Sequence, residues 1–515
     1  MKTNYNFKKF IAVLLLISLI VSMLSVITSC GSKDDGNNKP DSAEKDADGV
    51  QADIQNDNDK EETTERLYPD LEPKDFGGYE FTFLARTINT PDWLEWDHRD
   101  LVAEEMNSDV INDSVFIRNK KIEEKYNIVF NQMVEEHPAI YSKITRAVKA
   151  NDDIYDAVGM HVNQFAPLAQ NGNLIDFFSI PNIDLSMPWW DQGTVRDLSI
   201  GGKLFITQGD LLIMDNDAME AMIFNKDLLR DYDLESPYDI VKRGEWTFEK
   251  LMEMGRGIAK DLNGDGDMYI KDDLFGYILQ GDTANSFYVS GGEKICSKDK
   301  DDYPVITFGT ERGYKITEFL SEMLSDTQNS VNLHSYENKF PIYDEQVKMF
   351  SENRALFSWI RMRIVERLRG METDFGIIPL PKLDKNQEKY ITQNNPHTGA
   401  GISIPATAGD LERTGMILED LSAESRYTLQ PAYYEINLNG KYVRDDESQE
   451  MLDIILSNTA HDIGNVYDFG GFSSGAYWRY GRDMTIQWAS KFEKAEQKML
   501  KDIEKTIDAY EKIGE

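Results

Sequence analysis

Two stretches in the middle of the chain decide the fold: MIFNKDLL at residues 222–229 and EWTFEKL at residues 245–251. The first closes a predicted strand, and the second follows a short polar loop and begins a predicted helix. Two later stretches, FGIIPLP at 375–381 and GAGISIP at 399–405, lie on either side of a second polar loop. No single stretch is decisive, so the information lies in their order and separation.

Strands and helices alternate through the region before these stretches. Aromatic residues alternate with polar ones around Phe81, which predicts a first strand. A helix is expected to begin near residues 112–114, where side-chain oxygens can cap free N–H groups. A strand at 128–130, a helix around 141–150 and a strand at 154–160 follow. This order predicts βαβ units, a mainly parallel sheet and an α/β fold.

The four stretches, together with GKLF at residues 202–205, resemble the family 1 extracellular solute-binding proteins of ABC importers, among which the maltodextrin-binding proteins are best known. The resemblance extends from about residue 75 to residue 515. It implies a periplasmic-binding-protein-like fold, in which two α/β lobes joined by a hinge enclose an interlobe ligand cleft. The implied lobes are residues 75–207 with 380–429 for lobe one, and 208–379 with 430–515 for lobe two.

The N-terminus indicates where the protein works. A basic start is followed by an apolar run at 11–27 and then by Cys30, a layout that resembles the lipobox of bacterial lipoproteins. Residues 1–29 are therefore expected to be a signal peptide, and Cys30 a lipidated N-terminus carrying acyl groups such as palmitate. The alternative is an uncleaved membrane anchor. Residues 30–74 are predicted to be a disordered acidic tether, which places the body at the extracytoplasmic face of the cell membrane.

Composition limits the partners. The formal net charge is −36. Because phosphate binding needs a basic face, this charge argues against a nucleic acid as a partner. Only two cysteines are present, and lipidation of Cys30 would leave Cys296 without a disulfide partner. The C-terminal end, from Trp488 to Tyr510, is expected to be one long amphipathic helix. We expect a monomer that contacts a small molecule, the permease subunits and, through its lipid, the membrane.

The resemblance also implies ligand-binding residues. Sugar sites combine carboxylates, amides and flat aromatic side chains. The loop after residue 160 begins with His161, and an Asp-Arg pair of maltodextrin-binding proteins falls on Asn163 and Gln164 here. Stacking aromatics of the family fall on Trp359 and, near the last helix, on Trp478 in preference to Tyr477. The alternatives are a helix N-cap at Asn163 and a core position for Trp359.

Further candidates follow from topology. Arg86, Trp93 and Trp96 come after the first predicted strand, at the end of a sheet where clefts form in open α/β folds. These aromatic residues could equally pack on their own lobe. The pair Trp189-Trp190 is expected to be structural. The ligand class favoured by all of these residues is a carbohydrate.

An acidic loop, DLNGDGDMYIKD at residues 261–272, has the pattern of an EF-hand calcium loop. Its predicted ligands are side chains at loop positions one, three, five and twelve and a backbone carbonyl at position seven. These positions are Asp261, Asn263, Asp265, Asp272 and Asp267 respectively. Asp273 is a possible substitute for Asp272, and a solvated turn is the alternative. A structural Ca²⁺ is the only cofactor expected.

No enzyme is expected. The sequence has no Gly-x-Ser-x-Gly and no His-Glu-x-x-His, and no carboxylate pair lies in a hydrolase-like setting. Two other interpretations stay open: an extracellular carbohydrate-active enzyme, and a lipoprotein that senses a ligand for a membrane kinase.

Overall fold

The computed structural model describes residues 66–87, 98–438, 446–483 and 488–513. The predictions for the signal peptide, for Cys30 and for most of the tether lie outside these residues. Within them, no helix is both long enough and apolar enough to cross a membrane.

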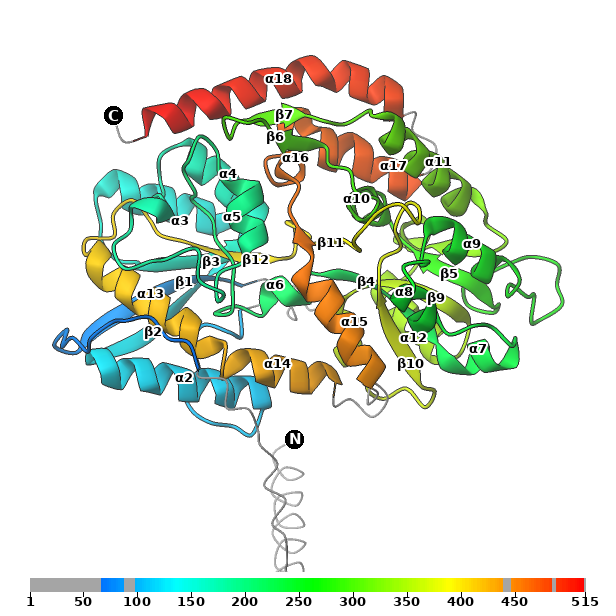
Figure 1. Ribbon diagram of the computed structural model, residues 1–515, viewed down its shortest axis with the longest axis horizontal. Helices are drawn as coiled ribbons and strands as arrows, with labels where there is room; N and C mark the ends of the chain where they lie inside the picture. The colour runs from blue at the N-terminus through cyan, green and yellow to red at the C-terminus, as the bar shows by residue number, and fades with distance from the viewer. Residues whose placement is uncertain (1–65, 88–97, 439–445, 484–487, 514–515) are drawn as a thin grey trace, which may run out of the picture. The chain divides into compact units, whose positions relative to one another are not determined.

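The first sheet is built mainly from the N-terminal third of the chain. Its strands, in spatial order, are β12 (Ala400–Ser403), β3 (Ala157–His161), β1 (Tyr79–Thr87) and β2 (Ile128–Glu136). β1 pairs in parallel with β2 and β3, whereas β12 runs antiparallel to β3. Helices α2 (Val110–Tyr126), α3 (His137–Ala150) and α13 (Leu411–Ser425) lie around this sheet (Figure 1). The alternation of apolar and polar residues around Phe81 therefore does mark a strand.

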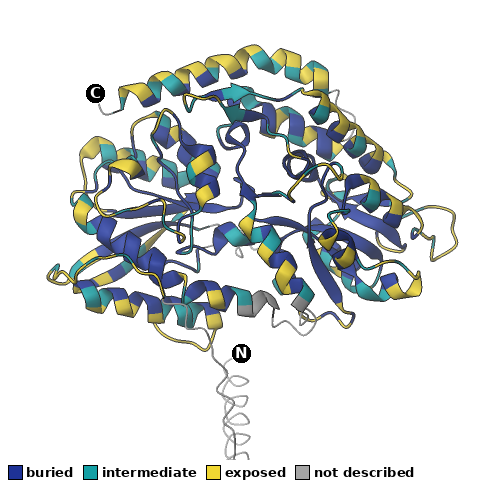
Figure 2. Ribbon diagram, viewed as in Figure 1, coloured by how far each residue is buried: buried dark blue, intermediate teal, exposed yellow. Residues whose placement is uncertain are grey.

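The second sheet is formed by the middle of the chain. Its strands, in spatial order, are β10 (Phe375–Pro379), β4 (Glu220–Asn225), β9 (Ala355–Arg361), β5 (Phe275–Leu279) and β8 (Ser330–Asn332). β4 is antiparallel to both of its neighbours, and β5 is parallel to β8 and β9. All residues of β4, β5, β9 and β10 are buried, which explains their continuous apolar runs (Figure 2).

Helices cover both sheets, and two short ladders complete the fold. The ladders are β6 (Cys296–Lys298) with β7 (Pro304–Ile306), and β11 (Thr392–Gln393) with β13 (Thr459–Ala460). The α-helices are α2 (Val110–Tyr126), α3 (His137–Ala150), α4 (Val162–Gln170), α5 (Gln192–Leu198), α6 (Met214–Asp217), α7 (Lys226–Asp231), α8 (Pro237–Lys242), α9 (Phe248–Arg256), α10 (Thr283–Ser290), α11 (Glu311–Ser325), α12 (Ile342–Ser351), α13 (Leu411–Ser425), α14 (Leu429–Leu438), α15 (Asp446–Ser457), α16 (Ile463–Val466), α17 (Trp478–Asp483) and α18 (Trp488–Lys512). Short 3₁₀ and π turns are η2 (Phe177–Ser179), η3 (Leu333–Tyr336), η4 (Met362–Leu368), η5 (Phe469–Gly471) and η6 (Ser473–Tyr477).

The stretches that identified the fold in the sequence contact one another in space. β10, from FGIIPLP, pairs with β4, from MIFNKDLL. The Trp246 indole N–H donates to the Pro379 carbonyl at 2.9 Å, and the Phe248 N–H donates to the Lys382 carbonyl at 2.9 Å. β12, from GAGISIP, reaches the first sheet and also bridges Thr207 through Ile402. The motifs therefore hold together the region where the chain passes between the sheets.

Element boundaries differ from the sequence predictions by a few residues. Helix α2 begins at Val110 with Asp109 as its cap, not at residues 112–114, because the Asp109 carboxylate accepts the Asn112 N–H at 2.9 Å. The strand expected from residue 154 begins at Ala157. The long C-terminal helix is confirmed as α18, which contacts α4 and β7 (Figure 1). The first sheet takes β12 from a part of the chain that follows the whole second sheet, and the exact lobe limits stay a prediction.

The pair Trp189-Trp190 has a structural role, as expected. Both side chains are at most 2% exposed, and their indole N–H groups donate to the two carboxylate oxygens of Glu419 at 3.1 and 2.8 Å. Burial raises the pKa of Glu419 to about 7, although the bonds from Trp190, the Asp184 backbone and Trp189 act in the opposite direction. The folded protein therefore holds a proton here that the unfolded chain loses near pH 4.5.

This proton makes a testable contribution to stability. Between pH 5 and 7 unfolding releases it, so Glu419 should lower the free energy of unfolding by about 1.4 kcal/mol per pH unit as pH rises. Urea denaturation of the wild type and of Glu419→Gln at pH 5, 6, 7 and 8 measures the difference in slope. We expect a shallower decline in the variant, whereas two parallel curves would show that Glu419 titrates normally.

Candidate functional site

Polar side chains from the second sheet meet polar side chains from helices and loops in the interior, where the chain passes between the two sheets. We call this group the polar seam. It consists of Asn163 in α4, Glu220 in β4, Asp282 before α10, Arg361 at the end of β9, and Asn395 and His397 in the loop before β12. These residues are separated by up to 234 positions in the sequence.

One half of the polar seam connects the first sheet to the loop before β12. The Asn163 side-chain nitrogen lies 2.9 Å from Nδ1 of His397. The His397 backbone N–H donates to the Asn395 side chain at 3.0 Å, and the Asn395 amide donates to Glu220 at 2.9 Å. His397 Nε2 lies 3.3 Å from the Asn465 side-chain oxygen. A chain of amides and an imidazole thus runs from α4 to β4.

The other half contains charged groups. Glu220 lies opposite Arg361 in the antiparallel pairing of β4 and β9, and Arg361 donates to Asp282 at 2.6 Å. Glu220 is fully buried, and this burial raises its pKa well above the usual value. The charge of Asp282 raises it further, whereas Arg361 and the Asn395 amide act against the shift. Because Glu220 and Asp282 are both close to a single guanidinium, that of Arg361, the second negative charge is not compensated, and this favours a proton on Glu220.

Several buried polar atoms beside the polar seam have no hydrogen-bond partner among the described residues. They are both side-chain polar atoms of Gln280, Oδ1 of Asn285 and Nε of Arg361. A buried polar group without a partner costs about 1–3 kcal/mol. A hydrogen-bonding ligand is one kind of group that could complete such atoms.

Trp478 lies next to these groups. Its indole nitrogen would be 3.1 Å from a Cβ placed on Gly281, the residue between Gln280 and Asp282. The His334 ring meets Trp478 edge to face at 5.3 Å, and the Arg482 guanidinium lies 5.6 Å from the centre of the indole. The Trp478 side chain is half-buried, so part of its ring stays available for stacking.

The other predicted ligand residues have different positions. Trp359 is 1% exposed within the core, and its indole N–H donates to Ser286 at 2.9 Å, which corresponds to the core alternative and not to a free stacking surface. Tyr477 is also fully buried in the core. In both cases neighbouring side chains enclose the ring in this structure, and a ligand-binding role for either residue stays a prediction.

The residues at the ends of β1 and β3 lie near one edge of the first sheet. Arg86 is fully buried and His161 is 6% exposed, while Gln164 is half-buried in α4. The N-cap of α4 is His161, so Asn163 is not the cap but a member of the polar seam. Trp93 and Trp96 lie outside the described residues.

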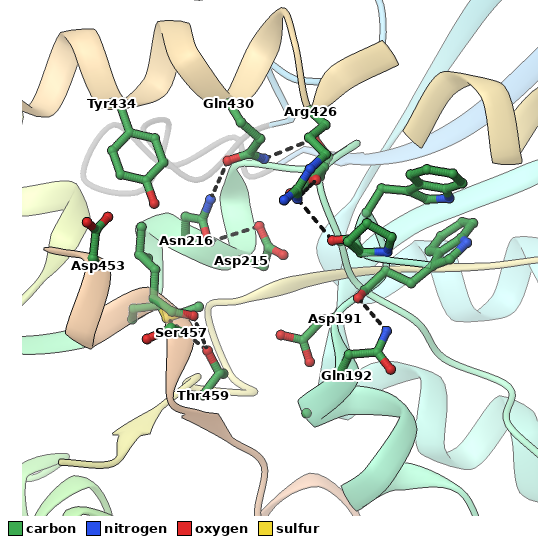
Figure 3. A pocket seen from close by; sticks show the side chains of 18 of the residues that line it. Asp191, Gln192, Asp215, Asn216, Arg426, Gln430, Tyr434, Asp453, Ser457 and Thr459 are labelled. Atoms are coloured by element: carbon green, nitrogen blue, oxygen red, sulfur yellow. Dashed lines mark hydrogen bonds and ion pairs between the residues drawn. The ribbon is translucent and has the colours of Figure 1, made fainter. Parts of the chain in front are cut away.

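A cavity of about 900 Å³ lies beside the chain segments that pass between the sheets (Figure 3). Met219 lines this cavity, while the next residue, Glu220, belongs to the polar seam, and neighbours in extended chain point to opposite faces. The neighbouring residues Asn394 and Asn395 show the same alternation. The Asn394 amide donates to the backbone carbonyl of Asp215, a residue of the cavity wall, and the Asn395 amide donates to Glu220 of the polar seam. Of the predicted ligand residues that the structure describes, none lines the cavity.

Solved structures share this fold. An ABC substrate-binding protein of Listeria monocytogenes, in complex with cycloalternan, matches with a TM-score of 0.53 and 12% identity, covering 83% of this chain and 99% of that one. A sugar transporter of Rhizobium etli in an open conformation gives 0.54 and 12%, covering 84% and 100%. A cyclo/maltodextrin-binding protein complexed with maltotetraose gives 0.52 and 13%, covering 83% and 97%.

The protein has the two-lobe solute-binding-protein fold. The fold expected from the resemblance is thereby confirmed. The sequence itself matches no protein-family profile, and no curated protein sequence matches it.

Within the solute-binding fold, sequence reasoning missed several members of the polar seam. Glu220, Asp282, Arg361, Asn395 and His397 were not predicted. One signal was present for Glu220 and Arg361, because each is a charged residue at the end of an otherwise apolar strand sequence. A charged residue in a buried strand requires a partner, which is a reason to search for a site there.

The predicted calcium loop is an exposed turn of the solute-binding fold. The Asp261 carboxylate accepts the N–H groups of Gly264 and Gly266 at 2.6 and 2.8 Å, and Asn263 accepts the Asp265 N–H at 2.9 Å. At its far end Asp273 is buried and accepts two backbone N–H groups, while Asp272 is exposed. Among the described residues no cluster of three or more His, Cys, Asp or Glu side chains forms a ready metal site.

Proposed function

We propose that the protein is a solute-binding protein that takes up a sugar or short oligosaccharide at the polar seam. The observation that carries this proposal is the set of buried polar atoms without partners around Gln280, Asn285 and Arg361, next to a half-buried tryptophan. Hydroxyl groups can satisfy such atoms, and the apolar face of a sugar ring can stack on Trp478. Three proteins with this fold are described as bound to or transporting sugars.

The position of the polar seam also supports a mechanism. Its residues come from both predicted lobes, so movement of the lobes about the connecting segments would separate the Asn395 amide from Glu220, which it contacts at 2.9 Å, and expose the unpartnered groups. A ligand that contacts both halves then favours the closed form by the difference between its contacts in the two states. The protein's task would be to bind and release its ligand unchanged.

The N-terminal sequence suggests a membrane anchor and an importer as the setting of this binding activity. We propose that Cys30 carries the lipid that holds the protein at the extracytoplasmic face of the cell membrane, and that the loaded protein docks on the permease subunits of an ABC importer. The support is the basic start, the apolar run and the cysteine that follows it. The proteins that share this fold are described as binding or transport proteins and not as enzymes.

A carbohydrate panel tests the proposal directly. We expect a rise in melting temperature and a change in tryptophan fluorescence with at least one mono- or oligosaccharide. Chromatography after incubation should return the sugar unchanged. A flat response across a broad panel contradicts the ligand class, and shortened products would favour an enzyme.

Trp478 provides the sharpest single substitution in this site. Trp478→Ala should weaken binding of the identified sugar by at least about 1 kcal/mol, because stacking on an aromatic face contributes about that much. Trp478→Phe keeps a flat ring and should retain most of the affinity. Titration calorimetry of both variants measures the effect, and equal losses would show that the ring is not a stacking surface.

We also propose that the loop at 261–272 binds Ca²⁺ as a structural ion. The spacing of its oxygen donors supports this, and the bonds from Gly264 and Gly266 to Asp261 already curve the first half of the loop. Asp273 turns inward, so the exposed Asp272 carboxylate stays available at position twelve. Removing calcium with a chelator should lower the melting temperature of the wild type but not of Asp261→Ala. An unchanged wild-type value would show that the loop is empty.

A further inference from the structure

The cavity opposite the polar seam has an excess of negative charge. Its wall contains four carboxylates and two arginines, which are Asp191, Asp210, Asp215, Asp453, Arg196 and Arg426 (Figure 3). Each arginine is already paired. Arg426 donates to Asp210 at 2.9 Å, and Arg196 donates to Asp197, which does not line the cavity, at 2.7 Å. Asp215 and Asp453 have no Lys or Arg partner within the described part of the chain, and Asp191 has only His461, at 3.5 Å.

Asp215 is the strongest indication of a missing partner. Its side chain is 5% exposed, and its only hydrogen bond among the described residues comes from the N–H of the adjacent Asn216, at 2.8 Å. Burial raises the pKa of Asp215 well above the usual value, the Asn216 N–H acts against this shift, and the charges of Asp191, Asp100 and Asp210 add to it. A carboxylate in this environment is stable only with a proton or with a cation beside it.

The walls favour an organic cation over a metal ion. Tyr427 and Tyr434 are half-buried and line the cavity together with Pro431 and Ile454, so apolar surface lies beside the carboxylates. In Figure 3, Asp453 lies at the left of the view, apart from Asp215 and Asp191, which lie nearer its centre. A metal ion would need several oxygens converging on one point, and no such group occurs in the described residues. Ammonium groups on an aliphatic chain suit separated carboxylates and aromatic faces better.

We propose that this cavity is a second binding site, separate from the polar seam, for an aliphatic polyamine. Its ammonium groups pair with Asp191, Asp215 and Asp453, and its methylene chain lies against the aromatic wall. Binding of the cation to protonated Asp215 releases that proton to solvent, so charge and protons balance. Residues from both predicted lobes line the cavity. A ligand bound there would therefore lie close to the segments that join the lobes.

Titration calorimetry of the full chain with spermidine and with putrescine at pH 6.5, in saturating calcium and 0.15 M salt, tests the proposal. Asp215→Asn and Asp453→Asn should each weaken spermidine binding by about tenfold, corresponding to about 1.4 kcal/mol. The matched control is Asp508→Asn, an exposed aspartate on α18, which should bind like the wild type. Titrations in two buffers of different ionisation enthalpy should reveal proton release in the wild type that Asp215→Asn lacks.

A second variant keeps the test independent of the carboxylates. Ser457 lines the cavity and is exposed, so Ser457→Phe should fill part of the space without disturbing the core, and should weaken spermidine binding. The proposal is overturned if spermidine gives no heat at millimolar concentration. It is also overturned if the Asp508→Asn control loses as much affinity as Asp215→Asn, or if Mg²⁺ competes at equal concentration with the same dependence on the variants.

Discussion

Replacing Trp359 with alanine is expected to lower the free energy of unfolding by about 3–5 kcal/mol. The ring is 1% exposed in the core, it lies on β9 across from Met222 of β4, and its indole N–H donates to Ser286 at 2.9 Å. The substitution opens a cavity between the second sheet and α10 and also leaves the Ser286 hydroxyl without its donor. The expected loss is a large fraction of the stability of an ordinary domain.

Urea denaturation of Trp359→Ala, Trp359→Phe and Trp478→Ala measures this effect. Trp359→Phe keeps most of the volume and should lose less stability than Trp359→Ala. Trp478→Ala, at a half-buried position, should lose little stability but much affinity. If Trp359→Ala instead kept its stability and lost sugar binding, the ring would be a stacking surface, as the resemblance implied, and the closed core position would not represent the working state.

The second large effect is expected from the buried ion pair of the polar seam. Asp282→Ala removes the partner of Arg361, whose side chain is 8% exposed, and leaves a buried guanidinium without its carboxylate. Breaking a buried pair from one side costs about 3–5 kcal/mol. Glu220, which lies opposite Arg361, can ionise and compensate in part, so we expect about 3 kcal/mol at pH 7.

A double variant separates pairing from packing. Asp282→Ala with Arg361→Met removes both charges and should recover much of the stability that Asp282→Ala loses. The control is Glu412→Ala, which breaks the exposed ion pair with Lys74 and should cost less than about 1 kcal/mol. A double variant no more stable than Asp282→Ala would show that Asp282 acts by packing or by its helix position and not as a counter-charge.

The residues of the polar seam and Trp478 differ in how far the sequence could predict them. It led to Asn163 and Trp478, because the resemblance fixed their place after β3 and before the last helix. It did not lead to His397 or Asp282, which lie in polar loops with no pattern of their own. Their importance arises only from the contacts with Asn163 and Arg361, between residues 234 and 79 positions apart.

The sequence by itself determined the order of strands and helices, because apolar periodicity acts locally, and its short motifs carried the resemblance that implied the solute-binding fold. Only the tertiary structure decided which side chains are available to a ligand. Trp359 and Trp478 are both tryptophans in apolar surroundings, yet one is enclosed by the second sheet and α10 while the other lies against Gly281 with part of its ring free. Burial depends on which distant segments pack against a residue, and that packing is a property of the whole fold.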